Sequence, residues 1–240
     1  MIRNVWIINR YSGATLLNRP FVPSEVDQDL FGGLISAIFS FAKEIGASSL
    51  KRLDMGDMEM VYLASEHIIC ALSINKNTAE DFVNEILKKI NDEFTLNFGT
   101  MMKNWVGNLD HFISFVSVVD HIVTAKLEQN TMKLRKIVTK TKEISRQISN
   151  IESLEEISTF KDQLNSLKEE SHQISYTDYD RFKEEKWINE HYIRQYKESQ
   201  EVRQVVKDVF LTTDLRLLIA RRKIQRKRLE PKSKAKLASE

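Results

Sequence analysis

Glycine and proline are scarce in this sequence, and their positions divide the chain in two. Among 240 residues there are 7 glycines and 3 prolines, and most of them lie before residue 100. Between Gly107 and Pro231 there is neither. A stretch without these residues can hold few tight turns, so the second half of the chain is predicted to be helical.

Cysteine is nearly absent as well, since Cys70 is the only one. A single cysteine excludes an intramolecular disulfide and a zinc site built from four thiolates. Cys70 lies in a predicted buried strand with no base nearby, so we expect an inert core thiol. The composition is consistent with a reducing compartment, and we predict a cytoplasmic protein.

The sequence also lacks long apolar runs. Its first ten residues turn polar at Asn9, so no signal peptide is expected. The most apolar later stretch, residues 112–125, contains Asp120 and His121 and is shorter than the roughly 20 residues that span a bilayer. With 42% hydrophobic and 29% charged residues, the composition is that of a folded globular chain.

No motif in the sequence names a reaction. Gly32 and Gly33 sit inside an apolar helical pattern without a phosphate-binding motif, so they are interpreted as small residues that allow close helix–sheet contact. The histidines form no metal-binding pair; they are His67, His111, His121, His172 and His191. We therefore expect a protein that is not an enzyme, with no catalytic or metal-binding residue and no cofactor.

The first part of the chain alternates between strand and helix patterns. Short runs of β-forming residues bounded by turn residues predict strands over 4–9, 15–21, 50–55, 58–64 and 67–74. Helices are predicted to open at the capping patterns Ser24–Asp27 and Thr78–Asp81. In the first helix, a broad apolar face is expected to lie flat on the sheet: Leu30, Leu34, Ile38, Phe41 and Ile45, with Phe31, Ile35, Phe39 and Ala42 beside them.

The second part carries two series of apolar residues at heptad-like spacing. The two series are out of phase, and Ser153 and Glu156 form a capping pattern at the break. We favour a helical hairpin near residue 152; a stammer in one continuous helix is the alternative. The predicted coiled-coil interface is Leu134, Ile137, Ile144, Ile148, Ile151, Ile157, Phe160, Leu164, Leu167 and Ile174.

Positive charge is concentrated at the C-terminal end, although the formal net charge is only +2. Residues 221–236 hold nine Lys or Arg and one acid, Glu230. Such a cluster can bind anionic lipids or acidic protein surfaces, can bind nucleic acid, or can serve only as a solubilising tail. Nucleic acid is less favoured because few aromatic residues lie there. The residues expected to contact an anionic surface are Arg221, Arg222, Lys223, Arg226, Lys227 and Arg228.

The opening Ile2–Gly13, the Leu30–Ile38 segment and the strand–strand–helix–three-strand–helix order resemble the longin (SNARE-like, profilin-like) domain, archaeal type. The resemblance covers roughly residues 1–96. It implies an α+β fold with a five-stranded antiparallel sheet and two helices, followed here by an all-α region resembling a coiled coil. The expected divisions are a domain over 1–98, a helical arm over 108–229 and a disordered basic tail over 230–240. Roadblock domains share this layout but usually begin with a helix.

Longin domains serve in vesicle-mediated transport and in small GTPase regulation, so the resemblance implies protein–protein interaction. We expect a partner that is a small GTPase or a longin or roadblock domain, bound at an open strand edge or helix face. The helical arm would then mediate assembly, including self-association. The alternative is a structural coiled-coil protein that binds nucleic acid or an anionic membrane through its basic C-terminus. A profilin-like ligand sensor is a third hypothesis.

Overall fold

A computed structural model describes residues 1–23, 27–45, 51–76, 78–174 and 190–237; the side chains of Lys43, 190–193 and 227–237 lie outside the described part. The contacts divide the chain into two compact units. Unit 1 comprises Met1–Glu128 and Ser175–Lys197, and unit 2 comprises Gln129–Ile174 and Glu198–Glu240. Helices α3 (Phe115–Gln147) and α6 (Glu190–Leu237) each contribute residues to both.

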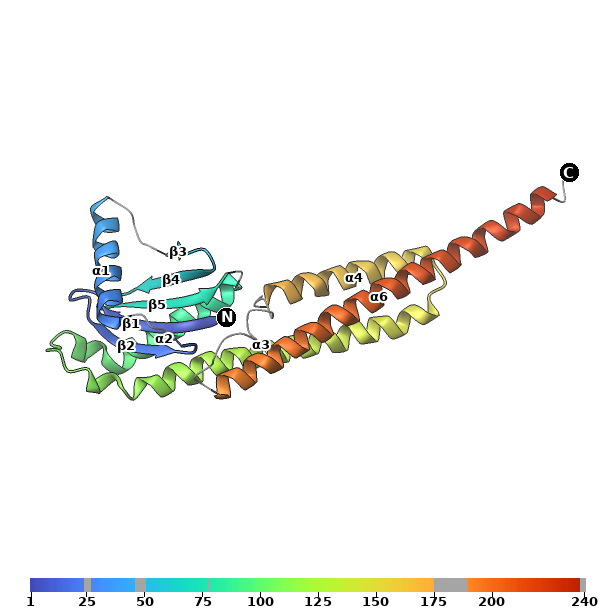
Figure 1. Cartoon of the computed structure of the whole chain (residues 1–240). Helices are drawn as coiled ribbons and strands as arrows, with labels where there is room; N and C mark the ends of the chain where they lie inside the picture. The colour runs from blue at the N-terminus through green and yellow to red at the C-terminus, as the bar shows by residue number, and fades with distance from the viewer. Residues whose placement is uncertain (24–26, 46–50, 77, 175–189, 238–240) are drawn as a thin grey trace. The chain divides into compact units, whose positions relative to one another are not determined.

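Unit 1 is built on an open, five-stranded antiparallel sheet with the strand order β2-β1-β5-β4-β3 (Figure 1). The strands are β1 Ile2–Asn9, β2 Thr15–Pro20, β3 Arg52–Asp54, β4 Met58–Ala64 and β5 Ile68–Asn75. All eight residues of β5 are buried, as its nearly continuous apolar sequence predicts for a central strand. The chain is therefore α+β, and the five predicted strands are present with their ends shifted by at most two residues.

One face of the sheet is covered by α1 (Gln28–Glu44). Phe31 stacks on Trp6 with ring centroids 4.3 Å apart, and Phe39 meets the edge of Tyr62 at 5.7 Å. Between these two aromatic pairs, Ile35 is 1% exposed. Three side chains of α1 at intervals of four residues thus form its contact with the sheet.

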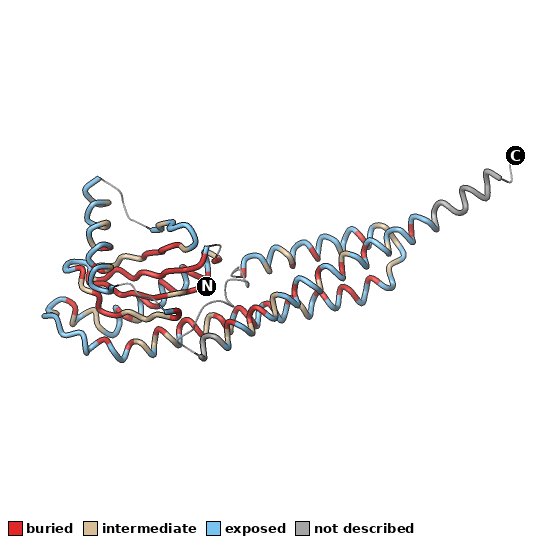
Figure 2. Tube along the Cα trace, viewed as in Figure 1, coloured by how far each residue is buried: buried red, intermediate tan, exposed pale blue. Residues whose placement is uncertain are grey.

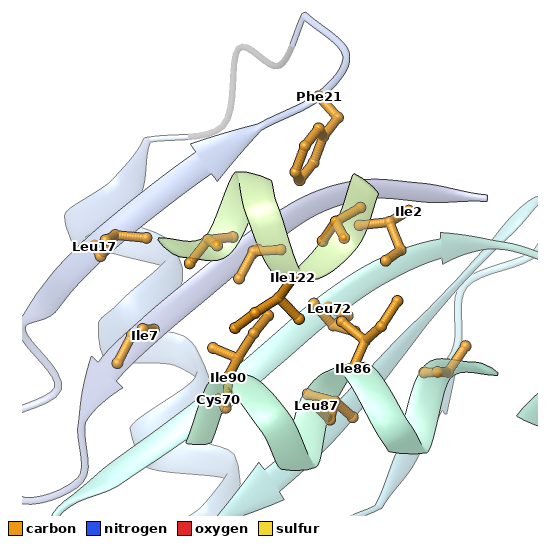
Figure 3. Packing of buried hydrophobic residues seen from close by; sticks show 14 of the residues in the cluster. Ile2, Ile7, Leu17, Phe21, Cys70, Leu72, Ile86, Leu87, Ile90 and Ile122 are labelled. Atoms are coloured by element: carbon orange, nitrogen blue, oxygen red, sulfur yellow. The ribbon is translucent and has the colours of Figure 1, made fainter. Parts of the chain in front are cut away.

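The opposite face of the sheet is covered by two helices (Figure 3). Ile86, Leu87 and Ile90 of α2 (Glu80–Met102) and Ile122 of α3 point at strand residues that include Cys70 and Leu72. At the end of this layer, the rings of Phe94 and Phe98 lie 4.9 Å apart, and each lies within 6 Å of the rings of Phe112 and Phe115. This face therefore carries the larger core of unit 1.

Arg19 and Asp120 tie α3 to the edge strand β2. Arg19 Nε and Nη2 donate to the two carboxylate oxygens of Asp120 at 2.7 and 2.8 Å. Such a bidentate pair fixes geometry as well as contributing energy. With the apolar contacts of Phe115, Ile122 and Leu127, it explains why unit 1 extends to Glu128 rather than ending near the predicted residue 98.

Unit 2 consists of the end of α3, the helix α4 (Leu154–Gln173) and most of α6. The break expected near residue 152 is present: α3 ends at Gln147, a 3-10 turn spans Ile148–Asn150, and α4 begins at Leu154. Ser153 caps α4 by accepting a hydrogen bond from Glu156 N at 3.1 Å, and the Glu156 carboxylate accepts from Glu152 N. The capping pattern read from the sequence thus makes the turn.

Two sequence expectations about helix ends differ from the structure. The tail predicted to be disordered from residue 230 instead continues α6 to Leu237; Lys, Ala and Leu favour helix there although Pro231 contributes no backbone N–H. Residue 78 does not cap α2, because the Thr78 hydroxyl donates to the Asn75 carbonyl. The expected cap Ser24 lies outside the described residues, and Asp27 caps α1 by accepting from Asp29 N and Leu30 N at 3.0 Å.

The turn between β1 and β2 lies against the start of α1. Gly13 has a φ of 73°, which favours glycine. A Cβ on Gly32 would lie 2.4 Å from the carbonyl oxygen of Gly13 and 2.6 Å from Thr15 Oγ1. A Cβ on Gly33 would meet nothing within 4 Å. The interpretation of small residues as packing devices therefore holds for Gly32 and not for Gly33.

This difference makes a matched pair of substitutions. We expect Gly32→Ala to lower the free energy of unfolding by about 1–3 kcal/mol, because backbone must move to admit the methyl group. Gly33→Ala should raise it by about 0.5–1 kcal/mol, because alanine favours helix and has space here. Urea denaturation of both variants measures the two changes; destabilisation by Gly33→Ala comparable to that by Gly32→Ala would contradict the packing described.

Candidate protein-binding surface

Helix α1 has a second set of apolar residues, which are exposed; much of α1 is drawn as exposed in Figure 2. Four large side chains, the last of them directly after the end of α1, are more than half exposed: Leu30 74%, Leu34 55%, Phe41 61% and Ile45 66%. Ala37 is exposed between Leu34 and Phe41. Residues spaced by three or four positions share one side of a helix, so these five form a continuous line, hereafter the α1 stripe.

The α1 stripe corrects the sequence interpretation of this helix. Leu30, Leu34, Phe41 and Ile45 were expected to lie on the sheet beside Phe31, Ile35 and Phe39, but the contact is made by the latter three. Both series recur at helical spacing, so periodicity alone could not separate them. The aromatic stacking on Trp6 and Tyr62 shows which series faces inward.

The size of the α1 stripe distinguishes it from scattered surface residues. Four large side chains exposed to this degree present on the order of 500 Å² of contiguous apolar surface, a size that on a monomer is often functional. That is more than half of the roughly 800 Å² that each partner buries in a standard interface. Burial of the α1 stripe would therefore supply most of one partner's share of such an interface.

Small and acidic residues border the α1 stripe. Gly33 is exposed beside Leu30, Leu34 and Ala37, and the space around its Cα would let another backbone approach closely. At the N-terminal end of α1 the exposed charged side chains are acidic, Asp27 and Asp29, whereas Glu44 at the other end follows Lys43 in the sequence. The surface therefore suits an apolar partner surface with a basic rim.

The edges of the sheet are poorer docking sites than the α1 stripe. Edge strand β3 has only three residues, and Arg52 on it pairs with Glu59 of β4. Asp54 pairs with Lys76 at 2.9 Å, which, with the Gly56 backbone N–H, holds the pKa of Asp54 below its ordinary value. At the other edge, Pro20 ends β2 without an N–H. Short, charged or proline-bearing edges disfavour strand addition.

The ten residues of the predicted coiled-coil interface come together in unit 2. Eight of them are buried in one apolar cluster, and Ile151 and Phe160 pack against it. The third member of this cluster is α6, which was not part of the predicted interface and contributes Val206, Phe210, Leu217 and Ile224. The heptads of α3 and α4 are thus in contact with a third helix of the same chain.

Polar contacts hold α6 against its two neighbours in unit 2. Lys168 of α4 pairs with Asp214 at 2.7 Å, and Arg135 of α3 pairs with Glu198 at 2.6 Å. Arg216 donates to the carbonyl of Ser145 at 3.1 Å. These contacts come from both sides of α6, so α6 packs along both α3 and α4 within this unit.

An open groove of about 810 Å³ lies between α3 and α4. Its floor includes Ile144 and Leu167 of the apolar cluster, and its rim mixes both signs of charge. Lys140 and Glu170 face each other across it at 3.9 Å. With its own charges opposed and no convergent polar groups of one kind, the groove is a packing feature of the helix pair rather than a ligand site.

The predicted anionic-surface residues lie on α6. Arg221, Arg222, Lys223 and Arg226 are exposed, whereas the side chains of Lys227 and Arg228 lie outside the described part. The residues that could act as a nucleophile or as metal ligands do not form a site. Burial raises the pKa of the Cys70 thiol to about 12, which keeps it protonated. Among the described residues, no three His, Cys, Asp or Glu side chains come close enough to hold a metal ion.

Comparison with known proteins assigns no family. No model of a known protein family matches the chain, and no curated protein matches it either. Within the residues described, no helix is both long and apolar enough to cross a membrane.

The packing of unit 2 can be tested by one core truncation. Leu164 is 0% exposed among the three helices, so Leu164→Ala should lower the free energy of unfolding by about 2–5 kcal/mol. The contacts of Leu164 come from the same chain. The thermal midpoints of the wild type and of the Leu164→Ala variant should therefore not depend on protein concentration. The measurement is circular dichroism melting at low and high concentration. A midpoint that rises with concentration would show that the heptads pair with another chain instead.

Proposed function

We propose that this chain is a non-catalytic binding module of the longin-like kind, and that the α1 stripe is where it docks a protein partner. The observation that carries the proposal is the line of Leu30, Leu34, Phe41 and Ile45, which are exposed although the helix has another face for the sheet. Exposed large apolar residues in one continuous line, with polar and acidic neighbours, are a feature of protein interfaces.

The kind of partner follows from the resemblance. The element order on which the resemblance rests, with a helix after the second strand and another after the fifth, is present in unit 1 and supports it. We therefore propose a small GTPase, or a longin or roadblock domain, as the partner, in a trafficking-like or GTPase-regulatory complex. The acidic N-terminal end of α1, with Asp27 and Asp29, favours partners whose apolar patch has basic neighbours.

The proposal assigns no reaction to the chain. The strongly perturbed groups of unit 1 are Cys70 and Tyr62, and burial raises the pKa of each to about 12. Both lie within the packed sheet, where a substrate would have to displace core side chains. A surface that binds through apolar contact fits the residues present better than a catalytic centre does.

Binding to purified partners tests the proposal. We expect the full chain to bind a member of a panel of small GTPases, each in its GDP-bound, GTP-analogue and nucleotide-free states, or of longin and roadblock domains. Leu34→Glu with Phe41→Glu should weaken that binding by at least about 100-fold, because two apolar anchors become charges in a desolvated contact. Isothermal titration calorimetry measures the affinities.

A matched control uses exposed apolar residues elsewhere in unit 1. Leu96 is 81% and Val106 95% exposed, so Leu96→Glu with Val106→Glu adds the same charge without touching α1. Both double variants should unfold at nearly the wild-type urea concentration, because none of the four side chains is buried. Equal binding by the wild type and the Leu34→Glu, Phe41→Glu variant would show that the partner binds a surface other than the α1 stripe. Failure to bind any member of the panel would count against the proposed function as a binding module for these partners.

A further inference from the structure

The outer face of α6 carries a second apolar line, independent of the α1 stripe. Leu211, Leu215, Leu218 and Ile219 are exposed by 63%, 52%, 45% and 54%. The side of α6 that faces the unit 2 core is formed by other residues, which are less than a tenth exposed: Val206, Phe210, Leu217 and Ile224. These leucines and the isoleucine are therefore not needed for the packing of α6 in unit 2.

The same face of α6 continues into cations. From Leu211, the intervals of four, three, four and four residues lead through Leu215 and Leu218 to Arg222 and Arg226, so all five share one side of the helix. Arg222 and Arg226 are exposed, and no hydrogen-bond or ion-pair partner faces them in the part of the chain that is described. An apolar line thus runs into exposed positive charge along one helix face.

Acidic residues are scarce in this stretch. Between Leu211 and Arg226 the only acid is Asp214, and Lys168 neutralises it at 2.7 Å. Arg216, by contrast, is turned toward the bundle and donates to the Ser145 carbonyl. The cations left facing solvent are Arg221, Arg222, Lys223 and Arg226, and the sequence adds five more between residues 227 and 236.

We propose that this face of α6 binds the surface of an anionic lipid membrane. Leu211, Leu215, Leu218 and Ile219 would insert at the boundary between headgroups and acyl chains, while the arginines and lysines contact lipid phosphates and carboxylates. A helix with large apolar residues and basic residues on one accessible side matches this requirement. Each cation near a charged leaflet contributes about fivefold to partitioning.

Two other occupants explain less of the surface. Nucleic acid would satisfy the cations through its phosphates but gives the four apolar side chains no partner. A second copy of α6 packed in parallel would cover the apolar line, but it would bring two clusters of nine cations side by side, where they repel each other. An anionic bilayer supplies both an apolar layer and negative charge.

Vesicle cosedimentation of the full chain tests the proposal. The probes are phosphatidylcholine vesicles and the same vesicles containing about one third phosphatidylserine. We expect binding to the second kind only, weakening as salt rises. Arg222→Glu with Arg226→Glu should reduce it by at least about 30-fold. Leu215→Gln with Leu218→Gln should reduce it by about tenfold, since less apolar surface enters the bilayer.

Controls place the same changes elsewhere on exposed helices. Lys133→Glu with Lys136→Glu repeats the charge reversal on α3, and Leu96→Gln repeats the loss of an exposed leucine on α2; both should bind like the wild type. Circular dichroism checks that each variant keeps its helix content.

Several results would overturn the proposal. One is equal binding to neutral and anionic vesicles, and another is no binding to either. Tight, salt-sensitive binding to duplex DNA or RNA that the glutamine variant leaves unchanged would identify a nucleic-acid surface. Self-association that the glutamine variant abolishes, without vesicle binding, would identify a second copy as the occupant. The proposal concerns unit 2 alone, so it does not depend on the α1 stripe.

Discussion

The burial of β5 on both faces is the constraint on which the rest of unit 1 depends. All eight residues of this central strand are buried. The sheet is open and does not fold back over its own faces, so other elements must cover both faces at β5. One side takes α2, α3 and a cluster of phenylalanines. The other takes α1 alone, anchored by Phe31, Ile35 and Phe39. Because those three side chains suffice, the remaining apolar residues of α1 are left on the outside.

Much of this arrangement could be predicted from the sequence, because local signals set it. The strands over 58–64 and 68–75 follow from apolar runs bounded by turn residues. The break between α3 and α4 follows from Ser153 and Glu156, whose side chains can reach only the backbone groups of that turn. In these places a few neighbouring residues decide the structure, so the pattern is sufficient.

Other parts depend on contacts between distant segments, which periodicity does not record. Both apolar series of α1 recur at helical spacing, and the choice between them depends on Trp6 and Tyr62 in strands far along the chain. Gly32 and Gly33 are equivalent in the sequence, yet the turn at Gly13 excludes a side chain from only one of them. The extent of unit 1 likewise depends on the pairing of Arg19 with Asp120, which is 101 residues away.

The heptads illustrate how a residue pattern can leave its partner open. Eight of the ten predicted interface residues are buried in one cluster and the other two pack against it, together with four residues of α6, a helix for which the sequence shows no heptad series. The apolar residues of α6 occupy two sides of the helix. The residues that face away from the core therefore obscure the heptad spacing of those that face it. A helix apolar on two sides has more such surface than its own bundle can bury. In both α1 and α6 the surplus lies in one continuous line. The line on α1 is acidic at its N-terminal end and the line on α6 is basic at its C-terminal end, and this difference in charge suits the two surfaces to different partners.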